Sequence, residues 1–186
     1  MENDYLESTK KQFEYYKMLG EKTFAQLSDD QLFWQYNDES NSIATIVKHL
    51  CGNMLSRWTD FLTTDGEKEW RNRDQEFVET ISTKVEMLEV WENGWKILFE
   101  AIDQITPENL DETILIRGEK HSVMDAFLRQ LAHYPYHIGQ IIYIAKILKN
   151  EDWKTLSIAR NQSENYTIQK LKAQKSKDIF SLKHSI

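Results

Sequence analysis

Two histidines four residues apart, His133 and His137, lie inside a long segment of helical apolar periodicity that runs from about residue 122 to about residue 149. At about 100° per residue, this spacing puts both imidazoles on one face of a helix, one turn apart, where a single metal ion can bridge them. The main apolar stripe lies next to them, so they border the buried side. The spacing alone leaves two interpretations open: a metal site, or two histidines at the edge of the core that hydrogen-bond to neighbouring helices.

The scarcity of residues that interrupt helices predicts a mostly helical chain. Six Gly and two Pro in 186 residues are few for the many turns of a β-sandwich or barrel. Apolar periodicity predicts four long helices, over residues 5–27, 43–62, 80–104 and 122–149. Pro135 lies inside the last of these and removes one backbone hydrogen bond, so we expect a kink beside the histidines.

Two connections between the predicted helices differ from simple turns. Residues 64–79 form a long, polar and aperiodic segment with large aromatic residues, and we interpret it as a lid or pocket wall. Residues 113–117 alternate apolar and polar side chains before Gly118, which predicts a short strand or an extended connection. We expect His121, which follows, to be an ordinary loop histidine.

Charge and cysteine content limit the classes of function. A net charge of −7 makes a nucleic-acid partner unfavourable, and no run approaches the ~20 uncharged apolar residues of a membrane span. The single cysteine, Cys51, excludes an internal disulfide and a CxxC cluster. We expect Cys51 to be a small packed residue. Because the first residues also lack signal-peptide features, we expect a cytoplasmic protein.

Five motifs lie along the chain: Ile46 to Leu50, which contains His49; Gly52 to Trp58; Trp70 to Asp74; His133 to Gln140; and Trp153 to Ser163. Together they resemble the DinB-like superfamily of four-helix metalloproteins. The resemblance is greatest to a subgroup without an assigned reaction, and Pro135 departs from the commoner pattern. It implies an all-α fold, a four-helix bundle with an atypical crossover connection, over residues 1–167. Residues 168–186 would then be a basic tail, which we interpret as a solvated end.

The resemblance also implies that His49, His133 and His137 bind one divalent metal ion, usually nickel or zinc. Three neutral imidazoles leave coordination positions open, as in catalytic sites. Characterised members of the superfamily include thiol-dependent S-transferases and a mycothiol-dependent maleylpyruvate isomerase. We therefore expect a metal-dependent enzyme acting on a small molecule, of the thiol S-transferase or hydrolase type, with a low-molecular-weight thiol as a candidate substrate. The alternative is a non-catalytic metal-binding or stress-response module.

Six polar residues are further candidates for the site: Asn53, Arg57, Arg71, Arg73, Gln140 and Arg160. Asn53, Arg57 and Gln140 would orient metal ligands or substrate, and the other three would recognise an anion from the loops. The alternative for each arginine is a surface salt bridge, which is the more frequent role of such a residue. A homodimer is also compatible with this fold, because bundles of this kind often pair through helix faces.

Overall fold

The computed structural model describes residues 2–183. The described chain forms two compact units, one ending at Asp152 and the other beginning at Trp153. The first holds five α-helices and a β-hairpin, and the second holds helix α6 (Ser163–Lys183). The last three residues of the predicted basic tail, 184–186, lie outside the described residues.

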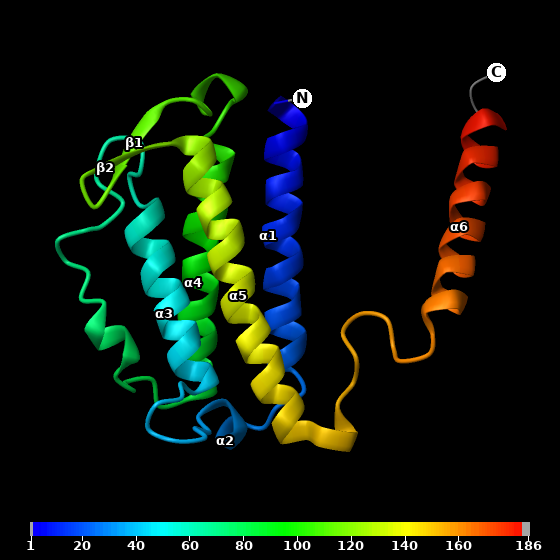
Figure 1. The fold of residues 1–186 in the computed structure, drawn as a ribbon, viewed down its shortest axis with the longest axis horizontal. Helices are drawn as coiled ribbons and strands as arrows, with labels where there is room; N and C mark the ends of the chain where they lie inside the picture. Colours follow the sequence, from blue (N-terminus) through cyan, green and yellow to red (C-terminus); the bar gives the residue numbers. More distant parts are fainter. Residues whose placement is uncertain (1, 184–186) are drawn as a thin grey trace. The chain divides into compact units, whose positions relative to one another are not determined.

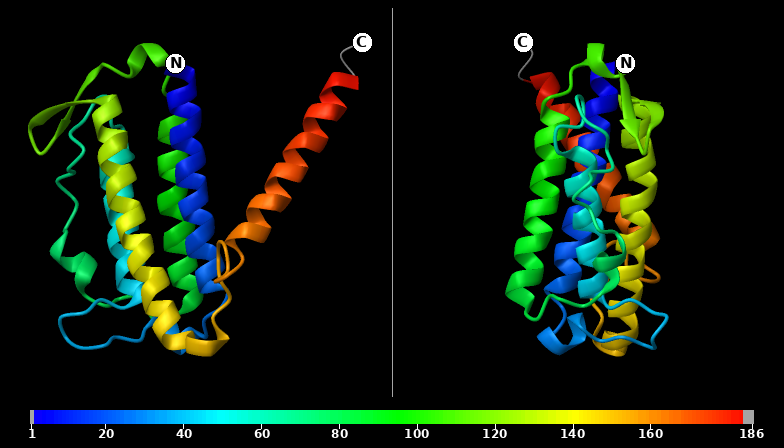
Figure 2. Two further views of the ribbon diagram at one scale, coloured as in Figure 1. Left: turned by 45° about the vertical axis from the view of Figure 1, so that its right-hand side comes forward. Right: turned by 90° about the vertical axis from the view of Figure 1, so that its left-hand side faces the viewer.

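Four long helices of the first unit pack side by side (Figures 1 and 2). They are α1 (Glu2–Phe24), α3 (Ile43–Trp58), α4 (Lys84–Asp103) and α5 (Val123–Lys149). Their core is rich in aromatic side chains, and Phe13, Trp91, Trp95 and Tyr134 are fully buried in it. The predicted mostly helical architecture is therefore confirmed.

The helices begin where a side chain can satisfy their first free amides. The hydroxyl of Ser42 accepts a hydrogen bond from Thr45 N at the start of α3, and Ser122 caps α5 in the same way. Helix α4 begins after a Thr83–Glu86 capping box, so its predicted start near residue 80 is wrong. Helix α5 continues through Pro135. A short helix, α2 (Asp29–Leu32), lies between α1 and α3.

The connection from α3 to α4 runs back along the helices. Because α3 and α4 point in the same direction, residues 59–83 return from the end of one helix to the start of the other (Figures 1 and 2). We call this segment the crossover; it includes the 3₁₀ turn η1 (Asp74–Phe77). Ser56 Oγ donates to the carbonyl of Gly66 at 3.0 Å, and Lys48 Nζ donates to that of Val78 at 2.8 Å. The crossover is thus fixed to α3 near both ends.

A β-hairpin joins α4 to α5. Strands β1 (Thr113–Ile116) and β2 (Glu119–Ser122) pair antiparallel, after the 3₁₀ turn η2 (Pro107–Asn109). The strand predicted from residue 113 is confirmed, whereas its partner was not predicted. His121 lies on β2 and not in a loop.

The turn of this hairpin is tied to the crossover. Arg117 and Gly118 both have positive φ angles, 55° and 75°, as a tight two-residue hairpin turn requires. The carboxylate of Asp65 accepts hydrogen bonds from both of their amides, at 2.8 and 2.7 Å. This contact fixes the position of the Arg117 backbone relative to α3.

Helices α3 and α4 approach each other at Gly94. A Cβ atom on Gly94 would lie 2.9 Å from Cys51 Cβ and 3.0 Å from its Cα, so only glycine fits there without movement of the helices. Cys51 is fully buried at this contact, and burial raises the pKa of its thiol. The prediction that Cys51 is a packed residue is confirmed. No helix in residues 2–183 combines the length and the apolar content needed to cross a bilayer.

We predict that Gly94→Ala destabilises the protein by about 1 to 3 kcal/mol, because the added methyl group overpacks the contact with Cys51. Urea denaturation followed by circular dichroism measures the change. Gly139→Ala is the matched control, since a Cβ there meets nothing within 4 Å. We expect it to be neutral or stabilising by up to about 1 kcal/mol. Equal losses in both variants would contradict the close approach.

Candidate metal centre

His49 of α3 and His133 and His137 of α5 form one cluster. Each offers a ring nitrogen, and these atoms all lie within 4.8 Å of one another. Nε2 of His133 is 3.1 Å from Nε2 of His137, and the ring centroid of His49 is 5.5 and 4.9 Å from those of the other two. The sequence-based prediction that these imidazoles converge is therefore confirmed as geometry.

Each imidazole of the cluster is held at Nδ1 by a side-chain oxygen. The pairs are His49 with Glu76 Oε2 at 2.8 Å, His133 with Gln130 Oε1 at 3.2 Å, and His137 with Gln140 Oε1 at 3.0 Å. An oxygen acceptor at Nδ1 favours the tautomer with the proton on that atom. Nε2 of each ring then carries a lone pair that is free to bind a metal ion.

The two glutamines act within the helix that carries their histidines. Gln130 and Gln140 each lie three residues from a histidine of α5, on opposite sides of the pair, at a spacing that brings side chains together on a helix. Gln140 was among the residues predicted to orient a ligand, and it does contact His137. Gln130 was not singled out as a site residue, although its spacing from His133 is the same.

Glu76 reaches the cluster from the crossover and was not predicted from the sequence. It is 6% exposed, and Arg71 donates to both of its oxygens, at 2.7 and 3.0 Å. Burial opposes ionisation of Glu76, but hydrogen bonds from His49 and Arg71 outweigh it and lower its pKa. A charged carboxylate therefore faces His49, and such a partner fixes the tautomer and orientation of a ligand ring. Phe77 stacks on the same ring, with centroids 4.8 Å apart.

The cluster has the electrostatics of a cation site. Burial, with a further contribution from His137, lowers the pKa of His133 to about 3, and burial lowers that of His137. Both rings are thus neutral at pH 7, the form that binds metal. Two neutral Nε2 atoms 3.1 Å apart repel each other unless a proton or a cation lies between them. In tetrahedral sites with bonds of about 2.0 to 2.1 Å, ligand nitrogens are roughly 3.3 Å apart, so this donor set fits a divalent ion.

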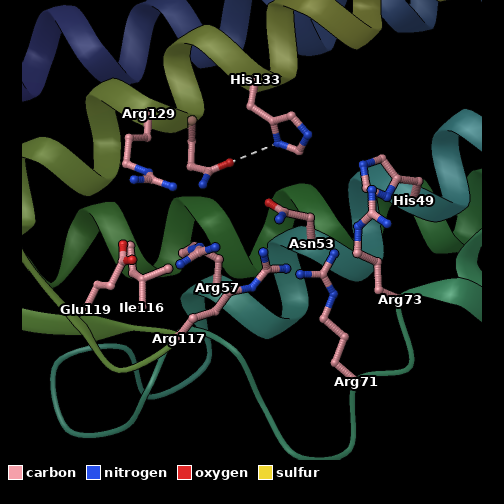
Figure 3. Close-up of a pocket in the computed structure, with 11 residues that line it drawn as sticks. His49, Asn53, Arg57, Arg71, Arg73, Ile116, Arg117, Glu119, Arg129 and His133 are labelled. Carbon is pink, nitrogen blue, oxygen red and sulfur yellow. Dashed lines mark hydrogen bonds between the residues drawn. The ribbon is translucent and has the colours of Figure 1, made fainter.

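A cavity of about 420 Å³ adjoins the cluster, and His49 and His133 form part of its wall (Figure 3). Five arginines also line it: Arg57, Arg71, Arg73, Arg117 and Arg129. The crossover contributes Arg71 and Arg73, so the predicted pocket wall over residues 64–79 is confirmed.

Of the predicted substrate-binding residues, Asn53 and Arg57 line this cavity. Asn53 Oδ1 accepts a hydrogen bond from the buried hydroxyl of Tyr134 at 3.2 Å, which holds its amide at the cavity wall. Arg160 belongs to the second unit, and its role stays a prediction. Arg117 and Arg129 were not predicted, since a hairpin turn and an exposed helix position give no signal of a shared cavity.

A model of one protein family, described as "Protein of unknown function (DUF1572)", matches residues 1–162. The matched range contains α1 to α5 and the hairpin. It therefore includes the whole histidine cluster and all five arginines of the cavity. No curated protein matches the chain.

We predict that Arg71→Met destabilises the protein by roughly 2 to 4 kcal/mol, because it leaves the buried carboxylate of Glu76 without its main cationic partner. Urea denaturation gives the free energy of unfolding. Adding Glu76→Met to the variant should restore part of the loss, since the unpaired charge is removed. Lys96→Met, which breaks the exposed pair with Glu100, is the control and should change stability by less than about 1 kcal/mol. Equal effects of Arg71→Met and Lys96→Met would refute a buried network.

Proposed function

The chain belongs to the DUF1572 family, and we propose that it binds one divalent metal ion, nickel or zinc, through His49, His133 and His137. We further propose that it is a metal-dependent enzyme acting on a small molecule, of the thiol S-transferase or hydrolase type. The observation that carries this proposal is the convergence of three imidazoles whose Nδ1 atoms are all held by oxygens.

The composition of the cluster supports a catalytic site over a structural one. Structural zinc sites use four protein ligands, whereas catalytic sites use three and keep a position open. The cluster has three candidate ligands among the described residues, and the nearest carboxylate, Glu76, is bonded to the far nitrogen of His49. The cavity along His49 and His133 gives a small molecule access to the open side.

The protein's own residues would position the reactants. A divalent ion, when bound, supplies Lewis acidity that favours the thiolate or hydroxide form of a ligand. Glu76, Gln130 and Gln140 hold the imidazoles in the orientation that presents Nε2. Asn53, fixed by Tyr134, would hold the substrate beside the cluster.

The arrangement of the long helices supports membership in the DinB-like superfamily. We propose that α1, α3, α4 and α5 form its four-helix bundle, with residues 59–83 as the atypical crossover connection. Parallel α3 and α4 support this, because they require a long return segment (Figure 1). The corresponding domain would span residues 1–167, and residues 168–186 would be the basic tail. We propose that the protein acts in the cytoplasm. It would form a homodimer if helix faces of two copies pair.

A second candidate function is a non-catalytic metal-binding or stress-response module. The buried network around Glu76 favours it, because a rigid ligand cage is also what a metal ion needs to staple α3 to α5. The two candidate functions differ in whether a metal ion bound by the three histidines would catalyse a reaction of a substrate.

We predict that the purified protein contains about one nickel or zinc ion per chain, measured by inductively coupled plasma mass spectrometry. The His49→Ala/His137→Ala double variant should lose the metal, because it leaves one of three ligands. His121→Ala is the matched control, since His121 pairs with Asp125 outside the cluster and should leave the metal content unchanged. Metal retained by the double variant would reject the three-histidine site.

The same samples separate the enzyme from the module. The metal-loaded protein is mixed with a generic electrophile and a panel of low-molecular-weight thiols, and conjugate formation is followed. Metal-dependent turnover that is lost in the double variant supports the enzyme. Stoichiometric metal without turnover of thiols or of small ester and amide substrates favours the module.

We predict that Gly52→Ala weakens metal binding by about 10- to 100-fold, the usual effect of losing a partner behind a ligand. A Cβ at this position would lie 2.5 Å from Glu76 Oε1, so the carboxylate must shift, and we expect the shift to weaken its hydrogen bond with His49. Competition with a chromophoric chelator gives the affinity. Gly139→Ala, which lies in α5 between His137 and Gln140 but meets no neighbour, serves as control. Unchanged affinity in Gly52→Ala would show that Glu76 does not support the site.

A further inference from the structure

The cavity beside the histidine cluster is strongly basic within an acidic chain. Five arginines line it, against a single acidic lining residue, Glu119, whereas the whole chain carries a net charge of −7. The arginines come from four elements that are distant in sequence: α3, the crossover, the hairpin turn and α5. Their convergence therefore reflects the fold and not a local run of basic residues.

Arg57 is the most informative of these residues. It is 5% exposed, and its Nε and Nη1 atoms lack a hydrogen-bond partner within residues 2–183. A buried guanidinium remains charged and is unfavourable when nothing pairs with it. Gly66 packs against it, so that a Cβ there would lie 2.9 Å from Nη1. The fold thus holds an unpaired cation firmly at the cavity wall.

The remaining arginines are only partly neutralised. Arg71 pairs with Glu76 at 2.7 Å and with Glu67 at 3.0 Å, and Glu67 also pairs with Arg117 at 3.3 Å. Arg129 makes no ion pair within the described part of the chain, and Arg73 lies over the ring of Phe77. An excess of positive charge is therefore left facing the cavity.

The guanidinium groups of Arg57, Arg71 and Arg117 point toward one another among the residues that line the cavity, with His49 and His133 at one side (Figure 3). We propose that this cavity binds a small molecule carrying a carboxylate or phosphate group, which Arg57 and Arg129 hold. A volume of about 420 Å³ suits a metabolite and not a macromolecular segment. The inference that this molecule is the substrate of the metal centre rests on the proposed function. The inference that the cavity binds an anion does not.

The test measures binding of two probes, inorganic phosphate and succinate, to the full chain by isothermal titration calorimetry, with uncharged succinamide as the comparison. We expect both anions to bind and succinamide not to bind. Arg57→Met and Arg129→Gln should each weaken binding by at least about tenfold, since each removes charge-assisted hydrogen bonds. Lys96→Gln removes one exposed positive charge outside the cavity and should bind as the wild type does.

Stability separates a binding role of Arg57 from a structural one. If Arg57 is kept for a ligand, Arg57→Met should be at least as stable as the wild type without anion, because an unpaired buried charge is removed. A structural role predicts a lower melting temperature instead. If this variant does not fold, the structural role is supported, and the exposed Arg129→Gln alone decides whether the cavity binds the anion.

A metal-depleted arm separates this inference from the proposed function. His137 does not line the cavity, so His137→Ala treated with chelator removes the metal and leaves the arginines in place. Retained phosphate binding supports the arginine site even if the protein holds no metal. Loss of phosphate binding in the metal-depleted variant would assign the anion to the metal and overturn the inference. Two results with metal present would also overturn it: the wild type binds neither anion at millimolar concentration, or both arginine variants keep the wild-type affinity.

Discussion

The hydrogen bond between His49 Nδ1 and Glu76 Oε2 connects the parts of this structure on which a function depends. It joins α3 to the crossover. Arg71, which lies in the cavity wall, binds both Glu76 and Glu67 and so continues this network. Because the hydrogen bond is buried, both partners must keep it: a carboxylate without His49 and Arg71 would be an unpaired charge in the interior. The same bond orients the one imidazole that α5 does not supply.

How far the site could be predicted depends on how local its contacts are. His133 and His137 share one helix, so their spacing was sufficient to place them together. His49 lies on another helix, so it could complete the site only if the two helices are neighbours, and the resemblance to a family implied that they are. Glu76 gave no signal, because residues 64–79 lack periodicity and only the path of the crossover brings it to His49. The helix predicted from residue 80 is a different case, because the Thr83–Glu86 capping box that decides its start is a local pattern, which the prediction overlooked.

Net charge was informative about the chain but not about the cavity. An acidic total disfavours a nucleic-acid partner, yet it is an average over a surface that the fold divides unevenly. Arg57 lies on α3, Arg129 on α5 and Arg117 in a hairpin turn, and in sequence each resembles an ordinary surface arginine. Asp65 fixes the hairpin turn because its carboxylate accepts hydrogen bonds from the amides of Arg117 and Gly118. The position of Arg117 in the cavity wall therefore depends on a backbone contact that no sequence pattern predicts.

Two glycines explain why the site lies on one side of α3. At Gly94 the backbone of α4 approaches Cys51 so closely that this side of α3 has no room for a ligand. At Gly52, one residue further along α3, the absent side chain makes space for Glu76. Polar side chains such as His49 and Asn53 therefore face α5 and the crossover, where the cavity remains. A tightly packed helix pair thus gives a rigid support, and the chemistry is confined to the side of α3 that the packing leaves open.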